Sequence, residues 1–409
     1  MNVLYVLNRF PKLSESFVIN EIHELESRGH TVAVFSLRRP EGNLQQSEVD
    51  RLDAEVGYLP DPSPSSALGT LGAWWLDPPV LRATLHTAPP VAHAGAAYVG
   101  AHCLRFVRGL EFEVDHVHGH FLNWPKLGAS YVSTHLDVPC TVTAHAYDLY
   151  SSETDLPGSS TNERLVRVLA DRMDRIVTIS EYNRTYLREG VGTSAPVDVV
   201  HMGIDLDKFE PSARTRPNRI LSVARFDEKK GIEHAVEAVA QVADDLPDLE
   251  YHLVGSGPRE EAVRELISEH GLEDTVELLG RVSDDRLVRE LDEARVFVLP
   301  SVIASDGDRD GIPVALMEAI AMETIPVSTT VSGIPELIEN GETGFLVPPR
   351  DTEALAEVLV GIFGDDPDYE IQPTALRETI AREFAVEGCV TALLESFETV
   401  RNEFTDRSA

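Results

Sequence analysis

The sequence predicts an α/β protein with two doubly wound parallel sheets in tandem. Its 409 residues exceed the usual size of one hydrophobic core, so two domains are expected. Apolar residues make up 43% of the composition, which is enough for ordinary globular packing. Short apolar runs alternate with amphipathic stretches along the chain, and this alternation is typical of a parallel sheet with helices on both faces.

The first half begins with the apolar run NVLYVL, which predicts a strand, and continues with a helical pattern that ends at Gly29. Further strands are expected at the runs TVAVFSL, VDHVHGHF, VPCTVTAHA and DRIVTIS. Residues 40–100 are rich in Pro, Ala, Ser and Gly and are expected to be irregular, with a helical insertion. These elements define an N-terminal domain of residues 1–205.

The second half repeats the pattern after a seam near residues 201–218, which are rich in proline and polar side chains. Its expected strands, separated by helical stretches, are RILSVAR, LEYHLVG, VELLG, ARVFVLP and TIPVSTT. They define a C-terminal domain of residues 206–385. The tail, residues 386–409, predicts an amphipathic helix that packs back toward the N-terminal domain and frays at TDRSA.

The chain carries a formal net charge of −34, and its basic residues are mostly arginine. This composition predicts a salt-rich (halophilic) cytoplasm, where screening makes self-repulsion tolerable; an acidic mesophilic protein is the alternative. It argues against nucleic acid as a partner, because phosphate binding needs a basic surface. The lysines are few and lie at positions 12, 126, 208, 229 and 230.

The N-terminus and the cysteines indicate the compartment. MNVLYVLNRF lacks a basic segment and a small-residue cleavage site, so it reads as a first strand and not as a signal peptide. The sequence contains no uninterrupted apolar stretch of about 18 residues, so no membrane-spanning helix is expected. The cysteines, Cys103, Cys140 and Cys389, are scattered and predict buried thiols, with neither a disulfide framework nor a metal site. A cytoplasmic protein is expected.

Two cations follow the first strand of the second domain. Arg225 lies at the end of that strand, and Lys230 lies at the start of the next helix, before Gly231. A guanidinium fork and a point charge at the carboxyl end of a parallel sheet suit two linked phosphates. A solvated turn is the alternative, and Lys229 is expected to face solvent.

The stretch DGIPVALMEAIA, residues 310–321, predicts a helix whose first turn presents backbone amides to an anion such as a diphosphate. Pro313 suits the first helical position. Glu318 lies about one and a half turns into the helix, where a carboxylate suits the hydroxyl pair of a ribose. Asp310, ahead of the helix, suits the hydroxyls of a sugar. The alternatives are a helix N-cap for Asp310 and a solvated side chain for Glu318.

Two further strand ends are candidates for nucleoside binding. Gly255, in the turn GSGP, allows close backbone approach, although glycine is common in such turns. Backbone groups of Arg281 and Val282, in LLGRV, are positioned to read a nucleobase edge.

Taken together, these segments resemble the family 4 glycosyltransferases of the GT-B fold, particularly those of exopolysaccharide (colanic-acid-like) assembly. The resemblance runs nearly end to end, through FPKLSESFVINEI, HGHF, TAHAYDLY, SEYNR, HMGIDLDKF, VARFDEKKG, VGSGP, LLGRV, DGIPVALMEAIA and SGIPELIENGETGFLVPP. It implies two facing Rossmann-like domains with an interdomain cleft. It also implies transfer of a sugar from a nucleotide-sugar to a hydroxyl with retention of configuration, without a metal ion or other cofactor.

The resemblance also assigns roles in the second domain. Arg225 and Lys230 would hold the donor diphosphate, with the backbone of Ile312, Pro313 and Val314 facing the diphosphate or sugar. Glu318 would bind the ribose. Asp310 stands where the family usually has a glutamate, so the charge is kept and the reach is one methylene shorter.

In the first domain, the resemblance places His145 near the donor sugar and its phosphate, with a buried structural histidine as the alternative. Asp148 is expected to orient that loop. His118 and His120 alternate along one segment, and a structural or acceptor-side role is favoured over metal binding. The loop FPKLSESF would approach the acceptor through Ser14 and Glu15, whose alternative role, shared with Ser16, is to cap the next helix.

The predicted function is therefore a retaining, metal-independent hexosyltransferase with a glycan or lipid-linked acceptor. Catalysis would stabilise the departing nucleoside diphosphate, with same-face displacement favoured over a double displacement through two carboxylates. Peripheral contact with the inner face of the membrane is compatible with such an acceptor. The alternatives are another GT-B enzyme, such as a sugar-nucleotide epimerase or a phosphorylase, and a non-catalytic nucleotide-sugar-binding protein. Dinucleotide oxidoreduction is disfavoured because no GxGxxG follows the first strand.

Overall fold

The computed structural model describes the chain except for residues 13–14, 41–48, 62–89, 151–161, 213–215 and 409. The described residues form two compact units. The N-terminal unit comprises Met1–Gly203 with Val386–Ala409, and the C-terminal unit comprises Ile204–Ala385. Each unit is built on one parallel sheet, as the alternating pattern predicts.

The N-terminal unit has, among its described residues, a seven-stranded sheet in the order β3-β2-β1-β4-β5-β6-β7. Its strands are β1 (Asn2–Arg9), β2 (Thr31–Arg38), β3 (Glu55–Tyr58), β4 (His116–His120), β5 (Cys140–Ala144), β6 (Arg175–Thr178) and β7 (Val197–Val199). The chain starts in the middle of the sheet, builds outward through β2 and β3, and then returns across β1 to build the other half. This order places the carboxyl ends of β1, β4 and β5 next to one another.

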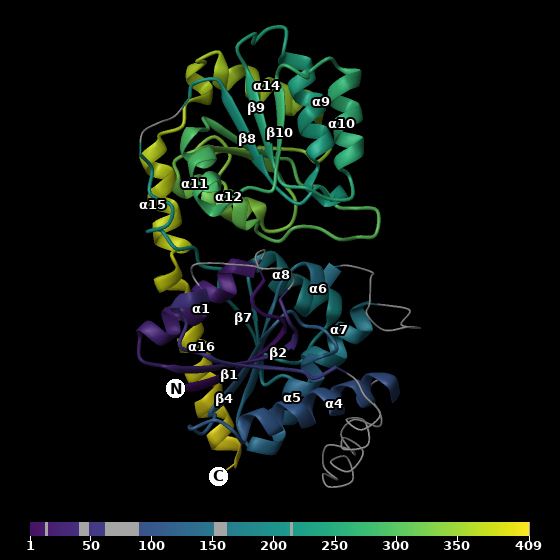
Figure 1. Cartoon of the computed structure of the whole chain (residues 1–409), viewed down its shortest axis with the longest axis vertical. Helices are drawn as coiled ribbons and strands as arrows, with labels where there is room; N and C mark the ends of the chain where they lie inside the picture. The colour runs from purple at the N-terminus through teal and green to yellow at the C-terminus, as the bar shows by residue number, and fades with distance from the viewer. Residues whose placement is uncertain (13–14, 41–48, 62–89, 151–161, 213–215, 409) are drawn as a thin grey trace. The chain divides into compact units, whose positions relative to one another are not determined.

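Helices cover both faces of this sheet (Figure 1). Helices α4 (Pro90–Val107) and α5 (Lys126–Leu136) pack side by side on one face, against a core that includes Leu4, Val6 and Val142. The alternate residues of the same strands point to the opposite face. There α1 (Ser16–Ser27) contacts α16 (Val386–Ser408), and Phe397 of α16 stacks on His116 of β4.

The remaining helices in the described part of this unit are short. They are η2 (Val49–Arg51), α6 (Tyr147–Tyr150), α7 (Asn162–Ala170), α8 (Glu181–Thr185) and the π-helical turn η3 (Tyr186–Val191).

The C-terminal unit has a six-stranded sheet over its described residues, in the order β10-β9-β8-β11-β12-β13. The strands are β8 (Arg219–Val223), β9 (Glu250–Val254), β10 (Val276–Gly280), β11 (Val296–Leu299), β12 (Ile325–Thr329) and β13 (Phe345–Val347). Helices α9 (Ile232–Val242), α10 (Glu260–Glu269) and α14 (Thr352–Phe363) pack together through α9. Helices α11 (Asp284–Glu293) and α12 (Val314–Ala321) contact strands β8, β11 and β12, and α15 (Pro373–Glu383) packs on α12.

Most expected elements are present, with four differences. Residues 40–100 contain a strand, β3, besides the start of α4, and their remainder lies largely outside the described residues. Strands β7 and β13 are three residues each, too short for a distinct apolar run. The last helix continues through Thr405–Ser408 instead of fraying there. Helix α12 begins at Val314, with Pro313 as its N-cap and not as its first residue.

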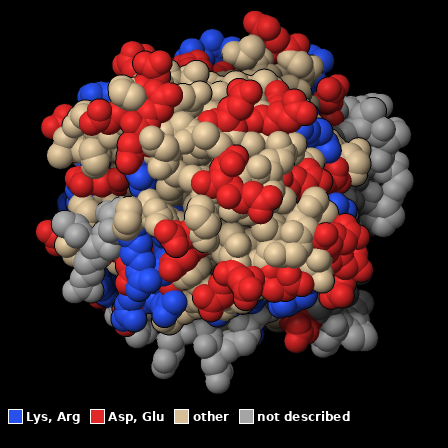
Figure 2. Space-filling model, turned by 90° about the horizontal axis from the view of Figure 1, so that it is seen from above, with Lys and Arg blue, Asp and Glu red and all other residues tan. Residues whose placement is uncertain are grey.

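The surface and the interior agree with the composition. Acidic side chains are spread over the face drawn in Figure 2, with lysine and arginine in smaller groups, in keeping with the net charge of −34. Cys103, Cys140 and Cys389 are buried and unbridged, as expected. Among the described residues, no helix combines the length and apolarity needed to cross a bilayer.

Candidate functional site

Lysines 229 and 230 are held at the carboxyl end of the C-terminal sheet by a tight turn. They end the 3₁₀ turn η4 (Glu228–Lys230), which closes on Gly231 with φ +63°. A Cβ atom on Gly231 would lie 2.1 Å from the carbonyl oxygen of Pro300, so only glycine fits. The amide of Val302 donates to the Lys229 carbonyl at 2.8 Å. The turn is therefore anchored to the segment that follows β11.

Asp310 is the centre of a buried ionic cluster. Lys230 Nζ lies 2.8 and 2.9 Å from its two carboxylate oxygens, and Ser301 Oγ donates to Oδ2 at 2.8 Å. Burial raises the pKa of Asp310, but Lys230, then Lys229, and the hydrogen bonds outweigh it and hold the pKa below its usual value. Asp310 is thus ionised at neutral pH. It is not the N-cap of α12, because Pro313 occupies that position.

The expectation that Lys229 faces solvent is wrong. Its Nζ lies 2.9 Å from Asp308 Oδ2 and 3.9 Å from Asp310 Oδ1, and only 16% of its side chain is exposed. Burial lowers its pKa, but Asp310 and Asp308 overcome this and raise it, so the ammonium group stays charged. Both neighbouring lysines therefore point toward Asp310.

The other predicted diphosphate contacts flank this cluster in the sequence. Arg225 is exposed, with Nε 3.4 Å from Asp227 Oδ1. Ile312 is buried, and within the described part of the chain no side chain caps the N-terminus of α12. The amides of the first helical turn have no partner within the helix, so Val314 and Ala315 begin an amide-rich helix end shortly after Asp310.

Glu318 lies on α12 and is partly buried. Burial raises its pKa to about 7, Asp284 adds to the rise, and Lys208 opposes it. Lys208 is itself paired with Asp284, at 3.2 Å. Glu318 is not the solvated side chain of the alternative interpretation, and it titrates in the neutral range.

Of the predicted nucleoside-binding residues, Gly255, Arg281 and Val282 lie where β9 and β10 end, whereas Glu318 lies on α12. Gly255 has φ +133°, and a Cβ atom there would lie 1.8 Å from the carbonyl oxygen of Ala224. Its amide donates to the Gly280 carbonyl at 2.8 Å, so this N–H is already used. Arg281 Nε donates to Ser256 Oγ at 3.2 Å, and Val282 follows it, half-buried.

In the N-terminal unit, His145 directly follows β5 and is 5% exposed. Its amide donates to Asp148 Oδ1 at 3.0 Å, and the amide of Leu122 donates to the other oxygen of the same carboxylate. Asp148 therefore orients the loop, as expected. Burial raises the pKa of Asp148 to about 6 against these backbone hydrogen bonds.

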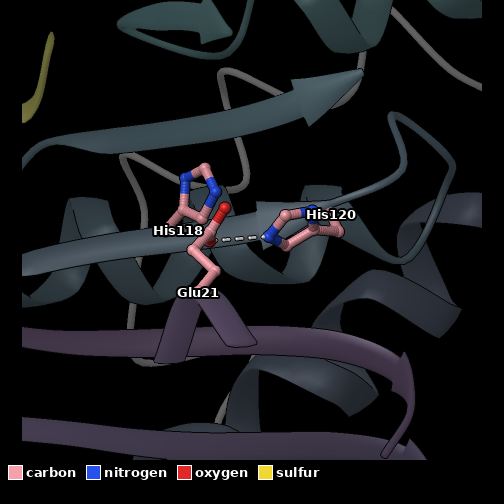
Figure 3. A group of neighbouring side chains, drawn as sticks. All are labelled: Glu21, His118 and His120. Carbon is pink, nitrogen blue, oxygen red and sulfur yellow. Dashed lines mark hydrogen bonds and ion pairs between the residues drawn. The ribbon is translucent and has the colours of Figure 1, made fainter. Parts of the chain in front are cut away.

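His120 lies directly against His145 and Glu21. Its Nδ1 is 3.1 Å from His145 Nε2, and its Nε2 is 3.0 Å from Glu21 Oε1. Tyr5 Oη donates to the same Glu21 oxygen at 2.6 Å. Figure 3 shows Glu21 of α1 meeting His120 across the sheet face, with His118 beside them.

Glu21, His118 and His120 present ligand atoms close enough together for a metal ion. Both ring nitrogens of His118, however, already face hydroxyls, at 2.8 Å from Thr141 Oγ1 and 3.1 Å from Thr143 Oγ1. The arrangement is that of a hydrogen-bonded network, which agrees with the structural role considered for these histidines.

The predicted acceptor-side loop is described in part. Glu15 is the N-cap of α1 but makes no side-chain cap bond; its Oε1 accepts from Lys12 Nζ at 2.5 Å. Ser14 lies outside the described residues. Ser16 is the first residue of the helix.

The sequence interpretation missed two polar residues beside these positions, the half-buried Glu21 and the buried Lys126. Glu21 is one turn beyond the loop motif, and Lys126 follows HGHF by five positions. Lys126 is 1% exposed and donates to Asn8 Oδ1 at 3.1 Å, and burial lowers its pKa to about 8 against Glu15 and Asp148. Its stem packs on Gly119, where a Cβ atom would lie 2.8 Å from Lys126 Cε. The scarcity of lysine was the signal that could have singled it out.

Known proteins are similar to this chain over both units. Residues 204–372 match the family model described as Glycosyl transferases group 1, and residues 14–208 match that described as Glycosyltransferase Family 4. A Salmonella typhimurium protein named as a colanic acid biosynthesis glycosyltransferase, WcaL, is 32% identical, over 98% of this chain and 100% of its own. The chain belongs to glycosyltransferase family 4. The amylovoran biosynthesis glycosyltransferase AmsK of Erwinia amylovora is 42% identical to this glycosyltransferase over 46% of the chain and 47% of its own.

Solved structures confirm the predicted GT-B fold of this glycosyltransferase. Sucrose-phosphate synthase from Thermosynechococcus elongatus superposes with a TM-score of 0.72 at 19% identity, covering 98% of this chain and 99% of its own. Anabaena Alr3699/HepE in complex with UDP superposes with a TM-score of 0.70 at 18% identity, covering 98% and 100%. Each consists of the same tandem of Rossmann-like domains, so the likeness establishes the fold.

Proposed function

We propose that this glycosyltransferase transfers a hexose from a nucleoside-diphosphate-sugar to a hydroxyl of a glycan or lipid-linked acceptor in exopolysaccharide synthesis. The observation that carries the proposal is the cluster of Lys229, Lys230 and Asp310 just ahead of the uncapped end of α12. The names of relatives such as WcaL and AmsK support the biosynthetic role. The HepE structures with UDP and with UDP-glucose support the donor class.

The donor is proposed to bind in the C-terminal unit through complementary charge. Arg225, Lys230 and the free amides at the start of α12 neutralise the diphosphate without a metal ion, and the backbone of Ile312–Val314 faces the diphosphate or sugar. Glu318 accepts from the ribose hydroxyls, and the strand ends at Gly255, Arg281 and Val282 adjoin the nucleobase.

Asp310 is proposed to accept from a hydroxyl of the transferred sugar. Its carboxylate shares Lys230 with the diphosphate, because an ammonium group has three N–H donors and two face Asp310 in this structure. The shorter aspartate side chain is compensated by its fixed position, held by Ser301 and both lysines.

The reaction is proposed to retain configuration by same-face displacement. The bond from the sugar to the diphosphate breaks, a leaving phosphate oxygen takes the proton of the acceptor hydroxyl, and the new glycosidic bond forms on the same face. The alternative nucleophile, Asp310, is a poor one, because its lone pairs accept from Lys230 and Ser301 and its pKa is held low. His145, Ser14 and Glu15 are proposed to serve the sugar and acceptor side.

The proposal is tested with a panel of nucleotide-sugars in thermal shift and transfer assays, at high salt. We expect one donor to raise Tm, and Lys230→Ala to weaken its binding about 10- to 100-fold, the effect of losing a charge-assisted hydrogen bond. Because Lys230→Ala also removes a partner of buried Asp310, the readout is the shift of Tm caused by the donor. Arg382→Ala, at an exposed pair with Glu383, is the matched control.

Unchanged donor affinity in Lys230→Ala would contradict the proposed site. Epimerised product from donor alone would indicate an epimerase, and stabilisation without turnover over a broad acceptor panel would indicate a binding protein. Inverted stereochemistry in the glycosidic product would contradict the same-face mechanism. Transfer that persists in EDTA is expected, because the cations and amides of the chain serve the diphosphate.

A further inference from the structure

His120 is buried and Glu21 is half-buried, and together they form a chain of hydrogen bonds that leads to His145. The proposed transfer assigns no role to Glu21 or to the direction of these bonds. His120 is 1% exposed, and the rings of Tyr5, Phe17 and His145 surround it. Where two polar atoms of this network face each other away from water, one must donate and the other accept, since an unmatched pair is costly to bury. The position of every proton can therefore be worked out in sequence.

The chain starts at a carboxylate that receives two hydrogen bonds. Burial, and then the neighbouring Glu21, raises the pKa of Tyr5 well above its usual value, so the phenol keeps its proton and donates to Glu21 Oε1. An ionised carboxylate only accepts. His120 Nε2, 3.0 Å from the same oxygen, must therefore carry a hydrogen.

The next two protons follow from the chemistry of imidazole. A neutral ring has one N–H and one lone pair, so with Nε2–H facing Glu21 the Nδ1 atom of His120 is an acceptor. Its partner, 3.1 Å away, is His145 Nε2, which must donate. His145 is neutral, because burial, then His120 and Lys126, lower its pKa well below the usual value. The Nδ1 atom of His145 is left with a lone pair.

We infer that Glu21 and His120 are positioning residues that hold His145 as its Nε2–H tautomer, so that Nδ1 acts as a hydrogen-bond acceptor. A hydroxyl can donate to such an atom, whereas a phosphate oxygen cannot. The inference rests on the proposed function in one respect, because that hydroxyl would belong to the sugar or the acceptor. It separates His145 from the residues that hold the diphosphate and assigns it to carbohydrate recognition.

The inference is tested by nitrogen NMR on the full chain labelled with ¹⁵N-histidine at pH 8, above the ordinary imidazole pKa of about 6.5. Signals of His145 and His120 are assigned from the variants His145→Asn and His120→Asn. We expect both rings to show a pyridine-type Nδ1 and a pyrrole-type Nε2. Exposed His23, on the same helix as Glu21, is expected to show averaged tautomers. A pyrrole-type Nδ1 at His145, or an averaged pattern like that of His23, overturns the inference.

Two variants of Glu21 separate positioning from folding. Glu21→Gln keeps an oxygen acceptor, so the tautomer of His145 should persist. Glu21→Leu removes the acceptor, so His120 is no longer fixed and the His145 signals should move toward the averaged pattern. If Glu21→Leu folds and His145 keeps its wild-type pattern, Glu21 does not position it. If Glu21→Leu does not fold, the wild-type and Glu21→Gln spectra still show whether His145 is held as its Nε2–H tautomer.

The same spectra address a metal ion at Glu21, His118 and His120. A metal on His120 Nε2 would replace the proton that Glu21 requires there, so EDTA would restore the pyrrole-type signal. We expect EDTA to change nothing, and a spectrum that changes on chelation overturns the proton assignment. All of these measurements are made without a nucleotide-sugar. Failure of the donor panel therefore leaves the tautomer result standing, and the reverse also holds.

Discussion

At the scale of single residues, Glu318 is a carboxylate whose protonation is coupled to its proposed ligand. Burial holds its pKa at about 7 in the ligand-free protein. Ribose hydroxyls donate to the ionised form, so donor binding favours loss of the proton. Below pH 7 part of the binding free energy is used to deprotonate Glu318. Above pH 7 the carboxylate is already ionised, so this cost disappears. Donor affinity should therefore rise with pH.

We expect the donor affinity to increase about tenfold from pH 6 to pH 8, since the ionised fraction rises from about one tenth to about nine tenths. Isothermal titration with the donor found in the panel measures it. Glu318→Gln should bind more weakly at pH 8 and show a flat profile. A flat profile in the wild type, or the same slope in both proteins, would rule out this role for Glu318.

The sequence singled out individual charged residues but did not show which residues they pair with. Arg225, Lys230, Asp310 and Glu318 were singled out from strand ends and helix starts, because parallel sheets bring those positions to one edge. The pairing of Lys229 with Asp308 was missed, since a local pattern gives no sign of which loop lies opposite.

Glu21, a half-buried residue, shows that a local pattern also gives no sign of tertiary contacts on a helix. Glu21 looked like an ordinary charge on an amphipathic helix, and only the tertiary structure brings it to His120. The sequence of a helix does not show whether a charged side chain meets solvent or a partner on the strand that the helix packs against.

At the scale of secondary-structure elements, the turn between β8 and α9 fixes the lysine pair. Gly231 adopts φ +63° and packs against the Pro300 carbonyl, where a Cβ atom would be 2.1 Å away. Gly271, after α10, has nearly the same φ, +65°, but a Cβ atom added there would meet no described atom within 4 Å. The two glycines share the left-handed backbone, but of the two only Gly231 lacks room for a Cβ atom.

This pair makes a matched test. Gly271→Ala should cost about 1 to 2 kcal/mol of unfolding free energy, the strain of left-handed backbone for alanine. Gly231→Ala should cost at least about 2 kcal/mol more, because relieving the clash must shift backbone. It should also weaken donor binding by moving Lys230 away from Asp310. Urea unfolding and the donor-induced shift of Tm measure the two effects. Equal losses in the two variants would show that the Pro300 contact does not constrain the turn.

Elements with a complete apolar run were predictable, and the shortest or least apolar elements were not. Strands β1, β2, β5, β8 and β9 are buried on both faces and read as continuous apolar stretches. Strand β3 is only partly buried at the sheet edge, and its sequence, EVGY, resembles a loop. Residues Thr405–Ser408 are polar, which predicted fraying. They are helical because they continue a long helix that is already formed.

At the scale of the whole molecule, the dominant property is the negative charge, because 69 acidic residues outnumber 35 basic residues. Many of the basic residues already form ion pairs, as Arg219 does with Glu250, Glu290 and Glu293. The remaining acids repel one another across the surface seen in Figure 2. Folding brings these charges closer together, so repulsion lowers stability most when salt does not screen it.

We therefore expect Tm to rise with KCl, most steeply between about 0.1 and 1 M, where the screening length falls from about 10 Å to about 3 Å. Above that range screening is nearly complete and the curve should flatten. Sucrose, which stabilises compact states without screening charge, is the control, and it should give a rise without this early steep phase. A second control is pH 4.5, where many carboxylates become protonated and the response to KCl should shrink. A Tm that is independent of KCl at pH 7.5, or a salt response that is unchanged at pH 4.5, would show that repulsion between surface charges does not limit the stability of this fold at low salt.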